Sequence, residues 1–123
     1  MMTPLVSVAI GGALGASARY LTGLAALRLL GAGFPWGTMT VNVVGSFLMG
    51  VLFVVLPQGG RLSPLVMTGL LGGFTTFSAF SLDAVTLYDK GAAGLAAVYV
   101  LASVIFSIAA LIGGIWLARS FAA

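Results

Sequence analysis

Uncharged hydrogen-bonding side chains recur every four residues in two otherwise apolar stretches of the chain. The two series are Thr38, Asn42, Ser46 and Tyr99, Ser103, Ser107. Residues four apart lie on one face of a helix, so each series predicts a polar stripe. A single Ser or Thr at such a place often packs or bonds to its own helix. The amide of Asn42 has more donors and acceptors than its helix can satisfy, which predicts a pathway for a polar solute or a bond to another helix.

The segment Gly69–Ser81 combines residues that disfavour a helix within an apolar stretch. The pair Gly72 and Gly73 precedes Thr75 and Thr76, and both glycine and β-branched residues have low helix propensity. We expect the third membrane helix to break here, in the middle of the membrane. Backbone groups freed in hydrocarbon are tolerated only where they are buried or line a cavity, and there they can hold ions. The alternative is an unbroken helix whose small residues form a contact face.

Two aromatic residues follow this segment at a spacing that places them on one helix face. Phe77 and Phe80 are three residues apart, and Ser81 is close to both. An aromatic ring is electropositive at its edge, so the two edges can contact a desolvated anion. The alternative is that both rings pack against lipid or the protein core.

Charged side chains are rare within the apolar stretches, and their types exclude most chemistry. Arg19 is expected either to extend to the membrane surface or to attract anions. Asp83 is the single carboxylate that a proton-coupled exchanger could use within the membrane. Because the chain has no His, Cys or Glu, an enzyme would lack both base and nucleophile, and its dispersed basic residues do not suit nucleic acid.

Composition assigns these residues to a membrane protein, since 61% of the 123 residues are hydrophobic and 6% are charged. A membrane span needs about 20 apolar residues. The predicted spans are about Pro4–Leu27, Trp36–Leu56, Pro64–Tyr88 and Ala92–Leu117. Links rich in Gly or Pro are expected at 31–35 and 57–60, with a further link at 89–91. Residues 1–123 are therefore expected to form a single all-α domain of four transmembrane helices, whose first span lacks the basic start of a cleaved signal peptide.

The Lys and Arg residues are balanced between the two sides of the membrane. Arg61 and Arg119 would lie on one side, Arg28 and Lys90 on the other, and Arg19 within a span. Orientation follows a bias in these residues, so a chain without one should insert both ways and pair as an antiparallel, dual-topology homodimer. The alternative is a single orientation that does not depend on the charge count.

Three segments together resemble the Fluc/CrcB family of fluoride ion channels. They are Gly11–Tyr20, Trp36–Ser46 and Gly72–Ser81, and the third is the most specific. The resemblance implies a multi-pass protein of the inner (plasma) membrane that exports fluoride passively as an antiparallel homodimer in the lipid bilayer. The balance of Lys and Arg points independently to the same assembly.

The resemblance also implies roles for individual residues. Asn42 would be the pore-lining amide, and Phe77 and Phe80 would contact fluoride with their ring edges. The backbone carbonyls of Gly72 and Thr75 from both subunits would hold one structural Na⁺ at the dimer centre. Further members of the fluoride pathway would be Thr38, Ser81, Tyr99, Ser103 and Ser107.

The chain departs from the family pattern at two positions. Ala79 replaces a common Thr, and Asp83 replaces a common Glu. Neither is one of the residues to which the resemblance assigns fluoride contact, so the fluoride interpretation stands. One alternative is a small dual-topology, proton-coupled multidrug antiporter, which would need a central carboxylate where the chain offers only Asp83. Another is an assembly subunit that transports nothing itself.

Overall fold

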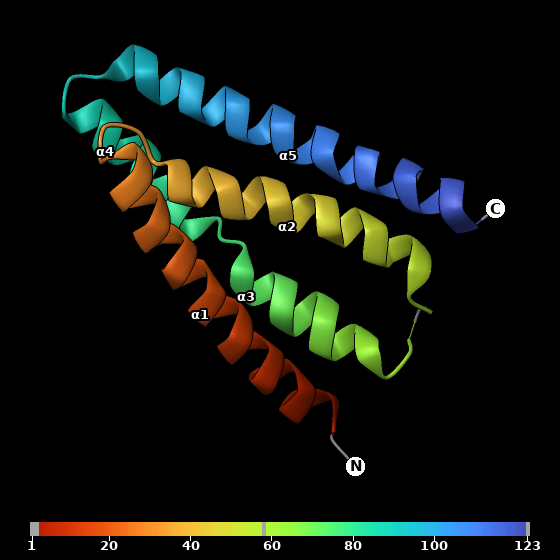
Figure 1. The fold of residues 1–123 in the computed structure, drawn as a ribbon. Coiled ribbons are helices and arrows are strands. Elements are labelled where there is room, and N and C mark those ends of the chain that lie inside the picture. Colours follow the sequence, from red (N-terminus) through yellow and green to blue (C-terminus); the bar gives the residue numbers. More distant parts are fainter. Residues whose placement is uncertain (1–2, 58, 123) are drawn as a thin grey trace.

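The computed structural model describes residues 3–57 and 59–122, which form helices joined by short links (Figure 1). The helices are α1 (Pro4–Leu30), α2 (Trp36–Val55), η1 (Pro64–Leu71), α3 (Gly72–Phe74), α4 (Ser78–Asp89) and α5 (Ala93–Ala122). Four stretches are long and apolar enough to cross a membrane: Pro4–Leu30, Trp36–Val55, Pro64–Asp89 and Ala93–Phe121. The prediction of an all-helical chain with four spans is confirmed.

Local interactions explain where the first helix begins and ends. The hydroxyl of Thr3 accepts a hydrogen bond from the Val6 N–H at 3.2 Å, which caps the first turn of α1. Gly31, with φ of 81°, ends the helix in a conformation that favours glycine. The helix runs three residues beyond the predicted span, which was given as about Pro4–Leu27, and Arg28 stabilises its last turn.

The last helix also extends beyond its prediction. Helix α5 continues to Ala122, whereas the sequence predicted an end at Leu117. Arg119 lies in its last turn, where a positive charge interacts favourably with the helix dipole. A basic residue near a helix end is therefore weak evidence that the helix has stopped.

Glycine residues allow the helices to approach closely. A methyl group added at Gly11 or Gly15 of α1 would overlap the carbonyl oxygens of Leu65 or Leu70. Gly50 lies in an equally close contact between α2 and α5, which run side by side in Figure 1. These contacts hold the four spans together without large buried side chains.

The third span is not one regular helix. Residues Pro64–Leu71 form π-helical turns, which the sequence did not predict, and the short α3 follows. Residues 75–77 lie outside α3 and α4, and Thr75 is extended, with φ of −90° and ψ of 159°. Figure 1 shows this link between α3 and α4, and it places the surrounding backbone next to α2.

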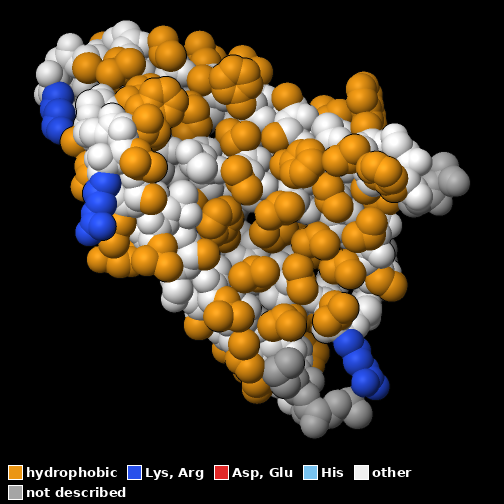
Figure 2. Space-filling model, viewed as in Figure 1, with side chains coloured by type: hydrophobic (Ala, Val, Ile, Leu, Met, Phe, Trp, Pro, Cys, Tyr) orange, Lys and Arg blue, Asp and Glu red, His pale blue; other side chains and the backbone are white. Residues whose placement is uncertain are grey.

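Most large apolar side chains lie on the outside of the chain. Figure 2 shows them over most of one face, with Lys and Arg at its edges. The buried hydrophobic cluster is small and contains Phe80, Leu87, Ala96 and Tyr99. An apolar exterior around a small core is typical of a protein whose solvent is lipid.

Candidate functional site

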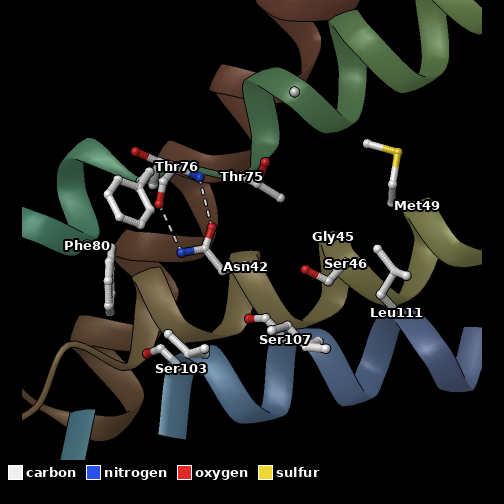
Figure 3. Close-up of a pocket in the computed structure, with 14 residues that line it drawn as sticks. Asn42, Gly45, Ser46, Met49, Thr75, Thr76, Phe80, Ser103, Ser107 and Leu111 are labelled. Carbon is white, nitrogen blue, oxygen red and sulfur yellow. Dashed lines mark hydrogen bonds between the residues drawn. The ribbon is translucent and has the colours of Figure 1, made fainter. Parts of the chain in front are cut away.

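An open groove of about 500 Å³ runs between α2, the link between α3 and α4, and α5 (Figure 3). Its lining includes Asn42, Thr75, Thr76, Phe80, Ser103 and Ser107. The polar stripes of α2 and α5 thus meet at one site, although they are far apart in the sequence. Each stripe contributes only part of its predicted length, because Thr38 and Tyr99 do not line the groove.

Asn42 binds the backbone of the link through both ends of its amide. Its Nδ2 donates to the Thr76 carbonyl at 2.9 Å, and its Oδ1 accepts from the Thr76 N–H at 2.8 Å (Figure 3). Asn42 therefore bonds to the non-helical link of the third span, and its role in a pathway stays a prediction. The second hydrogen of Nδ2 has no acceptor among the described residues, so Asn42 keeps one N–H donor at the groove beyond its bond to Thr76.

Phe77 and Phe80 lie side by side at the groove. Their ring centroids are 5.5 Å apart, and the ring planes are inclined at 52°. Phe77 is 76% exposed, whereas Phe80 is buried and packs against Tyr99 at 5.2 Å. The structure therefore holds one ring firmly at the inner wall and leaves the other at the open side.

Ser103 is buried beside the groove with its hydroxyl unpaired. The residue is 4% exposed, and its Oγ has no hydrogen-bond partner among the described residues. A buried polar group without a partner is costly, so such groups often mark a place for a ligand or an ion. Ser107 lines the groove one turn further along α5.

Thr38 and Tyr99 form a separate cluster with Asp83. Thr38 Oγ1 donates to Asp83 Oδ2 at 2.7 Å, and the Tyr99 hydroxyl donates to the same oxygen at 3.2 Å. Thr38 and Asp83 line a second cavity of about 330 Å³, together with Lys90. Phe80 and Tyr99 are in contact, so this cluster lies directly behind the inner wall of the groove.

Ser81 and Arg19 also bond to the backbone of the third span. The exposed Ser81 donates to the Phe77 carbonyl at 3.0 Å and does not line the groove. Arg19 was expected to extend to the membrane surface or to attract anions, and its Nε donates to the Gly73 carbonyl at 3.1 Å. This contact joins α1 to α3 and brings a positive charge close to the link.

A cation at this site would have to use oxygen atoms of the backbone or of hydroxyl groups. No cluster of three or more His, Cys, Asp or Glu side chains occurs in ranges 3–57 and 59–122. The carbonyl oxygens of Gly72 and Thr75 accept no hydrogen bond from any residue that the structure describes. Free carbonyl oxygens are suitable ligands for a hard cation, so these residues fit the predicted ion.

Thr76 is a residue whose importance the sequence did not reveal. Its backbone binds Asn42, and its Oγ1 accepts from the Ala79 N–H at 3.2 Å, which caps the start of α4. The sequence contained no usable signal for this role, because position 79 is Ala rather than the Glu or Gln of a capping box.

Comparisons with known proteins cover the whole site. The chain matches the family model "CrcB-like protein, Camphor Resistance (CrcB)" over residues 6–115. It is 64% identical over 124 residues to the "Fluoride-specific ion channel FluC" of Cereibacter sphaeroides (strain ATCC 17029 / ATH 2.4.9), with 100% of both chains covered. Proteins of the same name from Ruegeria sp. (strain TM1040) and Mesorhizobium japonicum (strain LMG 29417 / CECT 9101 / MAFF 303099) are 56% and 52% identical over 122 residues. These alignments cover 97% of this chain, and 97% and 98% of those proteins.

Proposed function

The chain belongs to the CrcB family and is a fluoride-specific ion channel, and from this premise we propose that fluoride crosses the membrane along the groove of Figure 3. The observation that carries this proposal is the buried hydroxyl of Ser103 at the groove wall, which has no partner within residues 3–57 and 59–122. The channel is not an enzyme, and it moves fluoride passively down its electrochemical gradient. The multidrug antiporter is not supported, because the matched relatives are fluoride-specific ion channels.

The groove offers the donors that a small anion needs. Fluoride is strongly hydrated, so a narrow path must replace its water with hydrogen bonds. Ser103 and Ser107 supply hydroxyls from α5, and Asn42 supplies its remaining N–H from α2. The electropositive ring edges of Phe77 and Phe80 supply the apolar part of the wall.

Three further residues stay predicted members of the pathway, although each hydroxyl is already bonded. Thr38 and Tyr99 donate to Asp83, and Ser81 donates to the Phe77 carbonyl. Fluoride would pass Phe80 to reach the Asp83 cluster. There it would compete with the Asp83 carboxylate for hydrogen bonds from the hydroxyl groups of Thr38 and Tyr99. Arg19 contributes positive potential near the link rather than direct contact with the ion.

A second copy in the opposite orientation completes the groove. The balance of Lys and Arg between the two sides supports this assembly. The groove is open along one side, and apolar side chains cover most of the face shown in Figure 2. In the antiparallel dimer, the open side of each groove faces protein instead of lipid, which excludes hydrocarbon from the polar wall.

The carbonyl oxygens of Gly72 and Thr75 from both copies would hold a structural Na⁺ at the centre of this dimer. Both oxygens lack hydrogen-bond donors among the described residues, and residues 75–77 interrupt the helix between them and α4. This interruption lies in the middle of the membrane, where free carbonyls need a partner. When bound, the ion supplies positive charge close to the anion pathway.

Fluoride efflux from liposomes tests the pathway. Purified protein is reconstituted in vesicles loaded with KF, valinomycin clamps the voltage, and an electrode follows release. We expect rapid fluoride release, no chloride release from KCl-loaded vesicles, and a strong loss of flux in Phe80→Ile. The matched control is Phe121→Ile, at an exposed ring near the end of α5. Wild-type flux from a folded Phe80→Ile protein would exclude this wall from the pathway.

A further inference from the structure

We infer that Thr76, held by Asn42, is a positioning residue that keeps the carbonyl oxygens of Gly72 and Thr75 free for the cation. This inference rests on the proposed cation site and assigns it a cause within a single chain. Neither side chain touches the ion in this arrangement. Both act by redirecting backbone N–H groups that would otherwise occupy the two carbonyls.

A regular helix would leave neither carbonyl free. In an α-helix, the N–H of each residue donates to the carbonyl four positions earlier. The Thr76 N–H would then donate to the Gly72 carbonyl, and the Ala79 N–H would donate to the Thr75 carbonyl. A free pair of carbonyls at these two positions therefore requires that both donors find other acceptors.

The structure provides another acceptor for each donor. The Thr76 N–H donates to Asn42 Oδ1 at 2.8 Å, and the Ala79 N–H donates to Thr76 Oγ1 at 3.2 Å. Asn42 Nδ2 also donates to the Thr76 carbonyl at 2.9 Å, so the backbone of Thr76 is held at both its N–H and its carbonyl. One side chain thus controls the Gly72 carbonyl, and the Thr76 hydroxyl controls the Thr75 carbonyl.

The carbonyls of Leu71 and Gly73 are bonded, whereas those of Gly72, Phe74 and Thr75 receive no donor from the described residues. The Leu71 carbonyl accepts from the Thr75 N–H at 3.0 Å and from Thr75 Oγ1 at 2.9 Å. The Gly73 carbonyl accepts from Arg19 Nε at 3.1 Å. The Gly72 carbonyl between them receives no donor from the described residues, although an unpaired carbonyl inside a membrane is costly. A cation between two copies would offset this cost.

The test measures cation affinity in the full-length protein without using transport. Purified protein in detergent is titrated with NaCl, N-methyl-D-glucamine chloride keeps the ionic strength constant, and the thermal unfolding midpoint reports binding. We expect Na⁺ to raise the wild-type midpoint. Thr76→Val removes the hydroxyl while keeping the shape, which releases the Ala79 N–H to the Thr75 carbonyl. Losing this one ligand in each copy should raise the half-saturating Na⁺ concentration about ten-fold, equivalent to about 1.4 kcal/mol of binding free energy.

Matched variants separate this role from general packing. Thr76→Ser keeps the accepting hydroxyl and should retain the wild-type Na⁺ requirement. Thr68→Val makes the same chemical change at an exposed site on η1, outside the groove, and should also leave it unchanged. Asn42→Ala releases the Thr76 N–H to the Gly72 carbonyl, so it should raise the half-saturating Na⁺ concentration. This variant provides the test if Thr76→Val does not fold.

The outcomes distinguish this inference from the proposed channel pathway. The inference would be overturned if Na⁺ did not change the thermal unfolding midpoint of the wild-type protein. It would also be overturned if Thr76→Val had the wild-type half-saturating Na⁺ concentration. Fluoride efflux from the same preparations would in either case still test the pathway, because efflux does not enter the titration. A higher Na⁺ requirement in Thr76→Val, with Thr76→Ser and Thr68→Val unchanged, would support the inference.

Discussion

Ser103→Ala should make the protein more stable and a poorer channel. The Ser103 hydroxyl is buried at the groove wall and has no partner among the described residues. A buried polar group without a hydrogen bond costs about 1–3 kcal/mol, so its removal should raise the free energy of unfolding by about 1 kcal/mol. Alanine keeps most of the side-chain volume, which limits any loss of packing.

The effect on transport should have the opposite sign. A hydrogen bond to a charged group contributes about 1.5–3 kcal/mol. Since about 1.4 kcal/mol is a factor of ten, fluoride flux should fall about 10- to 100-fold if this hydroxyl donates to fluoride at the barrier. A structural role would instead lower stability and flux together.

The assay combines fluoride efflux from liposomes with thermal unfolding of the same preparations. Ser120→Ala is the matched control in the same helix, because the Ser120 hydroxyl is exposed and donates to the Trp116 carbonyl at 3.0 Å. This control should leave the flux unchanged. Wild-type flux from Ser103→Ala would show that fluoride does not use the hydroxyl. A loss of stability would show that the hydroxyl has a structural partner, and either result refutes the reasoning.

Three further changes test other parts of the structure. Gly45→Ala should lower the free energy of unfolding by about 1–3 kcal/mol, because the new methyl would overlap Thr75. The control Gly94→Ala has open space around the new methyl and should leave the free energy of unfolding unchanged. Urea or thermal unfolding measures both. Asp83→Leu should lower the free energy of unfolding by about 2 kcal/mol, because it leaves the hydroxyls of Thr38 and Tyr99 without their acceptor. Asp89→Leu, at an exposed site, should lower it far less in the same measurement. Two Lys residues added at one end should bias orientation and lower flux, and co-expression with an oppositely biased chain should restore it; full flux from the biased chain alone would contradict the antiparallel dimer.

Periodic and local features of this chain could be predicted, and contacts at long range could not. The spans followed from apolar length, and the first link followed from Gly31 at the end of α1. The π-helical turns of Pro64–Leu71 were missed, because nothing in their composition distinguishes them from an α-helix in an apolar segment. Helices α1 and α5 continue a few residues beyond the predicted spans, because a basic residue in the last turn of a helix is favourable there.

Sequence alone therefore determined the spans and the two polar stripes, because each depends on length or spacing within one helix. The tertiary structure decided which polar groups are free to act. Asn42 bonds to Thr76, 34 positions away, and Thr38 bonds to Asp83, 45 positions away. Those bonds occupy some of the predicted donors and leave the Ser103 hydroxyl and two carbonyls without partners among the described residues. A hydrogen bond depends on distance and direction between groups on different helices, and only the packing of the spans sets both.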